Sequence, residues 1–321
     1  MTANKSVGIC LQCPRHCGVQ RSAGIVGYCR MPETVYVSRI APHFGEEPPI
    51  SGTRGSGTVF FTGCNLHCVF CQNRQISHVQ GNHPCGTPLT EDSLADRLLK
   101  LADSGVHNLN LVTPTHYTET VARVLTHIKP HVHIPIVWNS SGYESPDSLR
   151  RLDGLIDIYM PDFKYASSML AGILSGAPDY PDIAAAALME MFRQVGAVRF
   201  SGGGSLLQRG MIVRHLVLPG CRQDSIAVIR RLAGLLPLSG IRVSLMSQYT
   251  PDFLDTAFAL PEDIQADLEK QGIRPTLRRR LTEFEYRSVL DEADRLGAIG
   301  YRQERASAQA TYTPDFGKGI L

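Results

Sequence analysis

The sequence lacks a charge excess of either sign. Its 32 Lys and Arg residues nearly balance 30 Asp and Glu residues, so the net charge is +2 with neutral histidines. A chain that binds nucleic acid or an anionic membrane surface through charge carries a clear basic excess. We therefore expect no nucleic acid and no membrane among its partners.

The sequence also lacks long apolar runs. Its first residues, MTANKSVGIC, do not contain the apolar segment of a secretory signal. The longest apolar stretches, such as AAAALMEMF, are far shorter than the roughly 20 residues of a membrane span. These absences predict a soluble, cytoplasmic protein, and its hydrophobic content of 43% is enough for one large domain with a small appendage.

Cysteine, by contrast, is abundant and clustered. In an intracellular chain of this size, clustered cysteines indicate metal binding rather than disulfides. Two of the nine, Cys85 and Cys221, stand apart, and we expect them to be buried or inert thiols. The other seven form two groups, namely Cys10, Cys13, Cys17 and Cys29, and Cys64, Cys68 and Cys71.

From Thr58 onward, short apolar runs alternate with amphipathic segments. The runs are almost continuously apolar, as strands buried on both faces are. Strands that alternate with helices predict a parallel α/β sheet, and six such units predict a partial (β/α)6 barrel. The predicted strands are 58–61, 109–112, 135–140, 155–160, 212–219 and 241–246, and the predicted helices are 91–103, 117–128, 183–195, 224–236 and 282–295, with a short one in SPDSLRRLDG.

The remaining segments flank this barrel. Residues 1–57 read as a Cys-rich N-terminal segment and a Pro- and Gly-rich connector, which holds one short strand in TVYVSRI. Residues 58–300 form the predicted barrel, and residues 301–321 a C-terminal tail.

A loop with three cysteines, TGCNLHCVFCQN, directly follows the first predicted strand. In a parallel barrel this place is the C-terminal mouth, where active sites lie. Three thiolates on one loop can hold three irons of a [4Fe–4S] cube and leave the fourth iron open, and open coordination is typical of catalytic metals. The alternative is a zinc site or an ordinary cluster completed by a more distant ligand, for which the candidates are His67, His78 and Cys85.

The N-terminal cysteines have the spacing C-x2-C-x3-C-x11-C, broken by Pro14 and Gly18. Four cysteines within twenty residues indicate a closed metal site. Zinc suits a small structural knuckle and a cubane suits an electron relay, and the spacing does not separate the two. His16 is a possible replacement for one ligand. Because little apolar sequence surrounds this segment, we expect its fold to depend on the metal.

The loop CNLHCVFC resembles that of the radical S-adenosylmethionine (SAM) enzymes. Together with CQNRQIS, DIYMPDFKY, VRHLVLPG and LMSQYTP, it is similar to the pyruvate formate-lyase activating enzyme group, above all to uncharacterised relatives with an extra N-terminal cysteine cluster. The resemblance implies that SAM chelates the open iron, that a reductant such as flavodoxin or ferredoxin supplies an electron, and that a 5′-deoxyadenosyl radical removes a hydrogen atom from the substrate.

Polar residues follow the predicted strands and supply candidates for the SAM site. Thr113 and Thr115 stand where much of the family has a Gly-Gly-Glu motif, so their hydroxyls and the carbonyls around Pro114 are the expected substitutes, with a simple turn as the alternative. Asn139 and Ser141 are candidates for the ribose hydroxyls or the methionine carboxylate.

Further candidates lie on the later strands and on the loop itself. Asp162 and Lys164 lie on one side of an extended chain and resemble the Asp-x-Lys of the activating enzymes, with a surface ion pair as the alternative. Arg214 suits the cofactor carboxylate through bidentate pairing. The remaining candidates for cofactor binding are Phe70, which resembles the family's aromatic near the adenine, Asn73 and Gln248.

Three functions fit these patterns. The resemblance favours an enzyme that activates a glycyl radical enzyme by removing a hydrogen atom from a glycine. A radical SAM enzyme that modifies a small molecule or peptide would share every motif. A non-catalytic metal protein is the third, and the polar strand ends argue against it.

Overall fold

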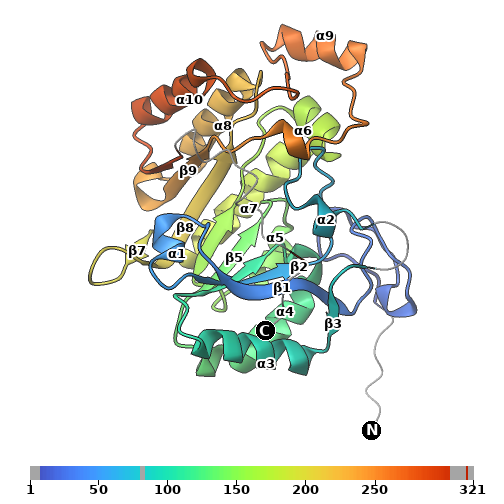
Figure 1. Ribbon diagram of the computed structural model, residues 1–321, viewed down its shortest axis with the longest axis vertical. Coiled ribbons are helices and arrows are strands. Elements are labelled where there is room, and N and C mark those ends of the chain that lie inside the picture. Colours follow the sequence, from blue (N-terminus) through green and yellow to red (C-terminus); the bar gives the residue numbers. More distant parts are fainter. Residues whose placement is uncertain (1–7, 80–83, 304–315, 317–321) are drawn as a thin grey trace.

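A mostly parallel sheet forms the centre of the protein (Figure 1). The computed structural model describes residues 8–79, 84–303 and Phe316. Neighbouring strands follow the order β10-β9-β8-β6-β5-β4-β2-β1-β3, in which the ladder from β2 to β10 is parallel and β1 and β3 are antiparallel. The strands are β1 (Val35–His43), β2 (Ser56–Phe61), β3 (Thr87–Leu89), β4 (Leu109–Val112), β5 (Ile136–Ser140), β6 (Ile158–Pro161), β7 (Arg199–Phe200), β8 (Leu207–Leu216), β9 (Arg242–Met246) and β10 (Gly300–Arg302).

All six predicted strands are present and lie side by side in chain order, which confirms the α/β fold with a parallel sheet. The sheet has two ends, β10 and β3, consistent with a partial barrel. Every residue of β2, β4, β5 and β6 is buried, as expected for strands covered on both faces. Trp138 in β5 is a core residue, whose indole Nε1–H donates to Glu144 Oε1 at 2.9 Å.

The helices cover the sheet and carry the end signals that the sequence shows. Thr90 caps α3 by accepting a hydrogen bond from the Ser93 amide at 3.1 Å, and α3 ends before Gly105. Helix α10 begins with a capping box between Thr282 and Glu285. The helices are α1 (Pro48–Ser51), α2 (Arg74–Ser77), α3 (Glu91–Asp103), α4 (Thr118–Ile128), α5 (Pro146–Arg150), α6 (Ser168–Ser175), α7 (Tyr180–Val195), α8 (Arg222–Leu235), α9 (Glu262–Lys270) and α10 (Glu283–Arg295).

Several predicted strand boundaries are wrong. Strand β2 begins at Ser56 rather than at residue 58, β6 begins at Ile158 rather than at residue 155, and β8 is Leu207–Leu216 rather than 212–219. The added part of β8, LQRGM, contains the exposed Gln208 and the half-buried Arg209 and pairs with the short strand β7. A search for apolar runs does not find a strand of this kind.

The connector contributes more to the sheet than its composition indicates. Strand β1, in the segment read as a connector, pairs with β2 along its length and with β3 on its other side. The loop after β1 ends in α1, which begins with Pro48 and Pro49. The loop therefore stands beside the central strands, and this position becomes important for the site.

The Cys-rich segment docks against the loop that follows β2. Arg15 Nε donates to the carbonyl of Asn65 at 2.9 Å, and its guanidinium carbon lies 3.7 Å from the centre of the Tyr28 ring. In Figure 1 this first, blue part of the chain lies beside α2. Most of the predicted tail falls outside the described residues, apart from residues 301–303 and Phe316. Over the described part of the chain, none of the helices combines the length and apolar character needed to cross a bilayer.

Gly142 offers a test of how tightly the ends of β5 and β6 are packed. It has a φ of +75°, and a Cβ atom there would lie 2.1 Å from the carbonyl oxygen of Asp162. We expect Gly142→Ala to lower the free energy of unfolding by about 2–4 kcal/mol, measured by urea denaturation, because both the backbone and the neighbouring strand must shift.

Gly234 provides the matched control for that substitution. It lies in α8 without a positive φ, and a Cβ atom there would meet no neighbouring atom within 4 Å. Gly234→Ala should leave stability unchanged or raise it by up to about 1 kcal/mol. Equal effects of the two substitutions would contradict the close packing at Gly142.

Candidate active site

The loop with three cysteines turns sharply at Gly63, directly after β2. Gly63 has a φ of +84°, and a Cβ atom there would lie 2.3 Å from Met31 Cγ and 2.9 Å from the carbonyl oxygen of Cys29. Only glycine fits such a turn and such an approach. The N-terminal segment therefore packs directly on the turn that starts the loop.

Hydrogen bonds from distant elements fix the rest of the loop. Asn65 Nδ2 donates to the carbonyl of Tyr143 at 2.7 Å, and the amide of Val69 donates to the carbonyl of Leu174 at 2.9 Å. The amide of Asp255 in turn donates to the carbonyl of Val69 at 2.7 Å. The loop is thus held from several sides, as a preorganised ligand set requires.

The three thiols of this loop line one cavity of about 240 Å³. Ser175 Oγ donates to Cys68 Sγ at 3.0 Å, and Ser77 Oγ lies 3.2 Å from Cys71 Sγ. Burial raises the pKa of the Cys64 thiol, and the neighbouring Cys68 and Cys71 raise it further. The pKa of Cys71 is raised in the same way, by burial and then by Cys68.

These thiols fit an iron–sulfur cluster. A thiolate is costly at a buried position unless a metal balances its charge, and hydroxyl donors to sulfur are usual around clusters. Each cysteine of a cubane binds a different iron, so the sulfurs need to surround one space. Within the described ranges, no three His, Cys, Asp or Glu side chains are grouped to hold a single metal ion.

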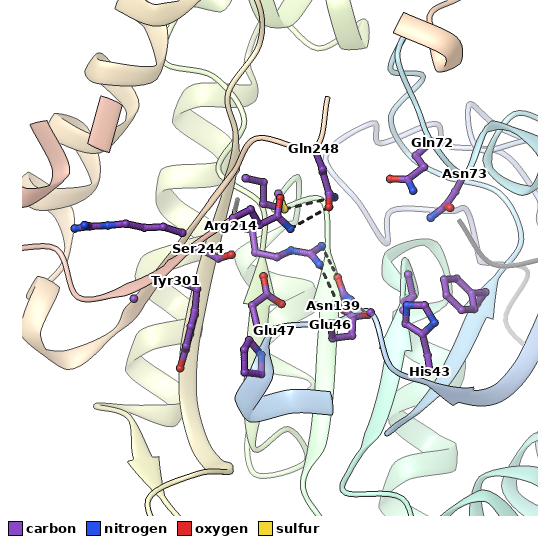
Figure 2. Close-up of a pocket in the computed structure, with 18 residues that line it drawn as sticks. His43, Glu46, Glu47, Gln72, Asn73, Asn139, Arg214, Ser244, Gln248 and Tyr301 are labelled. Carbon is purple, nitrogen blue, oxygen red and sulfur yellow. Dashed lines mark hydrogen bonds and ion pairs between the residues drawn. The ribbon is translucent and has the colours of Figure 1, made fainter. Parts of the chain in front are cut away.

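A network of charged side chains centred on Arg214 forms the wall opposite the cysteines. The guanidinium donates from Nε to Asp162 Oδ1 at 3.0 Å, from Nη2 to Asn139 Oδ1 at 2.7 Å and from Nη1 to Glu46 Oε2 at 3.4 Å. Arg214 lies in β8, and its partners come from the end of β6, from β5 and from the loop after β1. Figure 2 shows Arg214 with Asn139 and Glu46. Burial alone would lower the pKa of Arg214, but Asp162, Glu47 and Glu46 raise it.

Asp162 and Lys164 form a buried pair rather than a surface one. Lys164 Nζ donates to Asp162 Oδ2 at 2.6 Å, and the two side chains are 19% and 15% exposed. Although burial raises the pKa of Asp162, Lys164 and Arg214 hold it below its usual value. Burial lowers the pKa of Lys164, but the charges of Asp162 and Cys68 raise it above its usual value. Lys164 is therefore a cation beside the thiols.

Most of the other candidates also meet at these walls. Besides Asp162 and Lys164, the cavity of the cysteines is lined by Phe70, Asn73, Thr113, Asn139, Ser141, Arg214 and Gln248. Alternation along β8 left the direction of Arg214 open, and the structure turns Arg214 and Leu216 to the cavity. His215 faces the other way and is buried, with Nδ1 2.8 Å from the carbonyl oxygen of Phe163.

Thr113 and Thr115 have different positions. Thr113 lines the cavity with a φ of +58°, which is unusual for a β-branched residue and marks backbone strain at this point. Thr115, by contrast, is fully buried and its hydroxyl donates to Glu144 Oε1 at 3.0 Å. Thr115 is therefore a core residue and does not line the cavity of the cysteines, because the 3-10 turn after β4 directs its side chain into the core.

A second cavity of about 540 Å³ adjoins the first and shares Asn139, Arg214 and Gln248 with it. Figure 2 shows its walls, with Arg214 reaching toward Asn139 and Glu46 and with Glu47 and Tyr301 nearby. Sequence reasoning missed both glutamates. They lie in the Pro- and Gly-rich connector, and no local pattern shows that this loop returns to the ends of β5 and β8.

The N-terminal cysteines also gather in one place. Cys13 and Cys29 are buried, and burial raises the pKa of Cys13 to about 12, with further increases from Cys29, Cys10 and Cys17. Reciprocal backbone hydrogen bonds close the segment, from Cys10 to Val19 at 2.9 Å and from Gly18 to Cys10 at 3.1 Å.

This segment has the close packing of a small metal knuckle. A Cβ atom at Gly27 would lie 2.7 Å from Cys17 Sγ, so the backbone wraps tightly around that sulfur. The Tyr28 amide donates to Cys17 Sγ at 3.3 Å, and the Tyr28 ring stacks on His67 with ring centres 4.3 Å apart. Because His67 lies between Cys64 and Cys68, the two groups of cysteines are separated by one stacked pair of rings. The two isolated thiols differ, since Cys221 is buried and Cys85 exposed.

Comparison with protein families decides the class of this site. Residues 58–187 match the model of the radical SAM superfamily. This segment is similar to the radical SAM superfamily. The match runs from β2 through β6 and includes the loop with three cysteines. The superfamily consists of enzymes and implies a [4Fe–4S] cluster and SAM, with which the three thiols that line one cavity agree.

The uncharacterised protein MJ0674 of Methanocaldococcus jannaschii is similar to this chain, with 29% identity over 297 residues. The aligned region covers 89% of this chain and 74% of the relative. Among solved structures, Streptococcus suis SuiB bound to precursor peptide SuiA is 14% identical with a TM-score of 0.47, covering 75% of this chain and 46% of SuiB. Methylornithine synthase (PylB) is 15% identical with a TM-score of 0.43, covering 74% of this chain and 68% of the synthase. The chain spans less than half the length of SuiB.

Glu46 makes the stability of this protein depend on pH. Burial raises the pKa of its carboxyl from 4.5 to about 7, although Arg214 opposes this. The folded state then binds more protons than the unfolded state between about pH 4.5 and 7, so the free energy of unfolding falls as the pH rises through that range. Denaturation at several pH values should show a total fall on the order of 3 kcal/mol from this group.

Glu46→Gln isolates that contribution. Asp224, whose pKa burial also raises to about 7, titrates in the same range but is present in both proteins. The difference between the wild type and the variant should therefore grow in favour of the variant from pH 5 to pH 7 and then stay constant. Parallel pH profiles for the two proteins would contradict a raised pKa at Glu46.

Proposed function

We propose that this protein cleaves SAM reductively at a [4Fe–4S] cluster held by Cys64, Cys68 and Cys71, and that it modifies a substrate held in the adjoining cavity. The three thiols that line one cavity beside a charged polar wall carry this proposal. The cluster and SAM supply the electron and the 5′-deoxyadenosyl group, and the protein supplies the geometry.

The side chains around the cysteines have distinct tasks in this proposal. Lys164 and Arg214 place positive charge where the carboxylate of the SAM methionine would lie, and Arg214 has donors beyond the three already used. The strained backbone at Thr113 stands in for the family's Gly-Gly-Glu motif and presents its carbonyl and hydroxyl. Asn139, Ser141 and Gln248 offer hydrogen bonds to the ribose or the adenine, and Phe70 offers an apolar edge.

Burial of this wall also protects the reaction. Asp162 and Lys164 neutralise each other's charge without water, and the surrounding strand ends are buried. A site that excludes water keeps a reactive substrate from side reactions and strengthens each electrostatic contact.

A small molecule or a short peptide segment is the substrate class that the cavity favours. Its volume of about 540 Å³ is in the range of small-ligand sites, and its walls are rich in polar groups. Neither the family match nor the relatives support activation of a glycyl radical enzyme, which the sequence resemblance implied. That activity remains the second candidate, because a glycine-bearing loop is also a peptide segment.

For the N-terminal segment we propose a second metal centre on Cys10, Cys13, Cys17 and Cys29, either zinc or iron–sulfur. This proposal is supported by the close approach of Gly27 to Cys17, by the burial of Cys13 and Cys29, and by the electrostatic effect of the other three thiols on Cys13. The stacked Tyr28 and His67 connect it to the radical SAM loop, so an electron relay from a flavodoxin or ferredoxin has a short path.

Anaerobic reconstitution tests the principal activity. We expect the reduced wild-type protein to convert SAM to 5′-deoxyadenosine, measured by liquid chromatography, and Cys68→Ser to form at least 100-fold less because one cluster ligand is replaced. Cys85→Ala, which alters an exposed thiol, should retain the activity. Loss of the cluster in Cys85→Ala would instead show a closed four-ligand site, and an intact cluster without product would refute radical SAM chemistry.

A deuterium experiment separates the two substrate classes. Glycyl radical enzymes labelled with deuterated glycine should transfer deuterium into 5′-deoxyadenosine only if the protein is an activating enzyme. We expect no transfer beyond that of a Cys68→Ser control, measured by mass spectrometry. Transfer from any such partner would move the assignment to the activating enzymes.

Metal analysis tests the second centre. A variant with Cys64, Cys68 and Cys71 all changed to alanine should still contain metal, measured by emission spectrometry together with a sulfide assay. Zinc without sulfide would identify a structural site, and iron with equal sulfide a cluster. Adding Cys13→Ala should remove that metal. A triple variant that is folded and free of metal would contradict the proposed centre.

A further inference from the structure

Two residues that line the cavity of about 540 Å³ each have a buried acceptor atom with no donor among the described residues. Glu47 is 8% exposed, and its Oε2 atom is buried with no hydrogen-bond partner among the described residues. Gln303 also lines this cavity, and its Nε2 donates to Gln248 Oε1 at 3.0 Å. Its Oε1 atom is buried and has no partner in the part of the chain that the structure describes. Unpaired acceptors of this kind are rare in folded proteins and call for an explanation.

The local chain cannot satisfy the Glu47 carboxylate. Glu47 precedes α1, where a backbone amide would ordinarily donate to such a side chain. The first two residues of that helix are Pro48 and Pro49, which have no amide hydrogen. No hydrogen bond from the helix start to the Glu47 side chain is present. The sequence EEPP thus presents a carboxylate and removes its nearest donors.

The nearby cations form their ion pairs with other carboxylates. Arg214 is close enough for Glu47 to raise its pKa, yet its hydrogen bonds go to Asp162, Asn139 and Glu46. Arg302 lines the cavity but forms an ion pair with Asp294.

Two further groups do not supply the missing charge. Burial lowers the pKa of His43, as does the charge of Arg39, so the imidazole is neutral near pH 7. Burial raises the pKa of Tyr301, and the phenol stays neutral. Across both cavities, as far as the structure describes them, the ion pairs of Lys164 and Arg214 go to Asp162 and Glu46. Glu47 also lines the larger cavity, and it is the carboxyl group there whose Oε2 atom has no hydrogen-bond partner among the described residues.

We propose that this cavity binds a cationic nitrogen group of the substrate, an ammonium or a guanidinium, with Glu47 as its counter-ion and Gln303 as a second acceptor. A guanidinium has several N–H donors in one plane and pairs readily with a carboxylate. The proposal rests on the function proposed above, since it names the chemical class of the substrate. An amine metabolite and a basic residue of a peptide share this group.

Ligand-observed NMR titration of the anaerobically reconstituted, unreduced protein tests the proposal. The probes are n-butylguanidinium and its neutral isostere n-butylurea, at fixed ionic strength with saturating SAM. We expect the cation to bind at least tenfold more tightly than the urea, and Glu47→Gln to weaken the cation about tenfold with no change for the urea.

Two variants control for general effects of charge and folding. Glu262→Gln removes an exposed carboxylate of α9 and should leave the affinity for n-butylguanidinium unchanged. Glu47→Asp keeps the charge on a shorter side chain and should retain part of the affinity. Thermal denaturation of each variant verifies that it is folded. Equal affinity of the wild type and a folded Glu47→Gln for the cation would overturn the proposal.

Further arms identify what the carboxylate recognises. SAM carries its own ammonium group, so loss of n-butylguanidinium binding when SAM is added would assign Glu47 to SAM and overturn the proposal. Displacement by millimolar Mg²⁺ or K⁺ would overturn it in favour of an inorganic ion. The capped peptide Ala-Ala-Arg-Ala-Ala distinguishes the two sources of the cation. It should bind more tightly than n-butylguanidinium if the substrate is a peptide, and less tightly if the substrate is a small molecule. Either result supports a cationic subsite.

The outcomes for the two proposals are separable. Binding of the cation is measured without reduction, so it does not require SAM cleavage. A protein that binds the cation through Glu47 but forms no 5′-deoxyadenosine retains the subsite and loses the proposed function. A protein that forms 5′-deoxyadenosine but does not distinguish n-butylguanidinium from n-butylurea retains the function and loses the subsite.

Discussion

The hydrogen bonds of the Arg214 guanidinium connect the strand ends and the loop that line the two cavities. A buried guanidinium is tolerated only when its donors meet acceptors, because the cost of removing it from water is several kcal/mol. Its partners come from β5, β6 and the loop after β1, so satisfying one side chain fixes three strand ends at once. Asp162 then binds Lys164 and places that ammonium near the cysteines. The wall opposite the cluster loop is in this sense a single electrostatic unit.

The cluster loop depends on a second constraint, the approach of the N-terminal segment to Gly63. There the carbonyl of Cys29 and the side chain of Met31 occupy the space that a side chain would need. Arg15 extends the same contact to the carbonyl of Asn65. A metal-dependent fold of the N-terminal cysteines would therefore influence the catalytic loop directly. The proposed second centre would thus have a structural role, whether or not electrons also pass through it.

The charges of the site divide into a balanced part and an unbalanced part. Asp162, Lys164, Arg214 and Glu46 compensate one another, which suits a permanent framework for a cofactor. The Oε2 atom of Glu47 has no hydrogen-bond partner among the described residues, and the prolines after Glu47 remove the backbone donors that could supply one. Unpaired buried groups destabilise the folded protein and are retained mainly at functional sites, where a bound ligand can supply the missing partner.

The sequence by itself determined the parallel α/β fold and the position of the three-cysteine loop after the first predicted strand. It also indicated that this loop binds an iron–sulfur cluster. Buried strands, helix caps and cysteine spacing are local patterns, and each results from physics that acts within a few residues. It could not place Thr115 in the core, turn Arg214 rather than His215 to the cavity, or bring Glu46 and Glu47 to the ends of β5 and β8. Those positions depend on contacts between segments up to 168 residues apart, as from Glu46 to Arg214. Only the folded chain brings such charges together, because their partners are chosen by packing in space and not by spacing in the sequence.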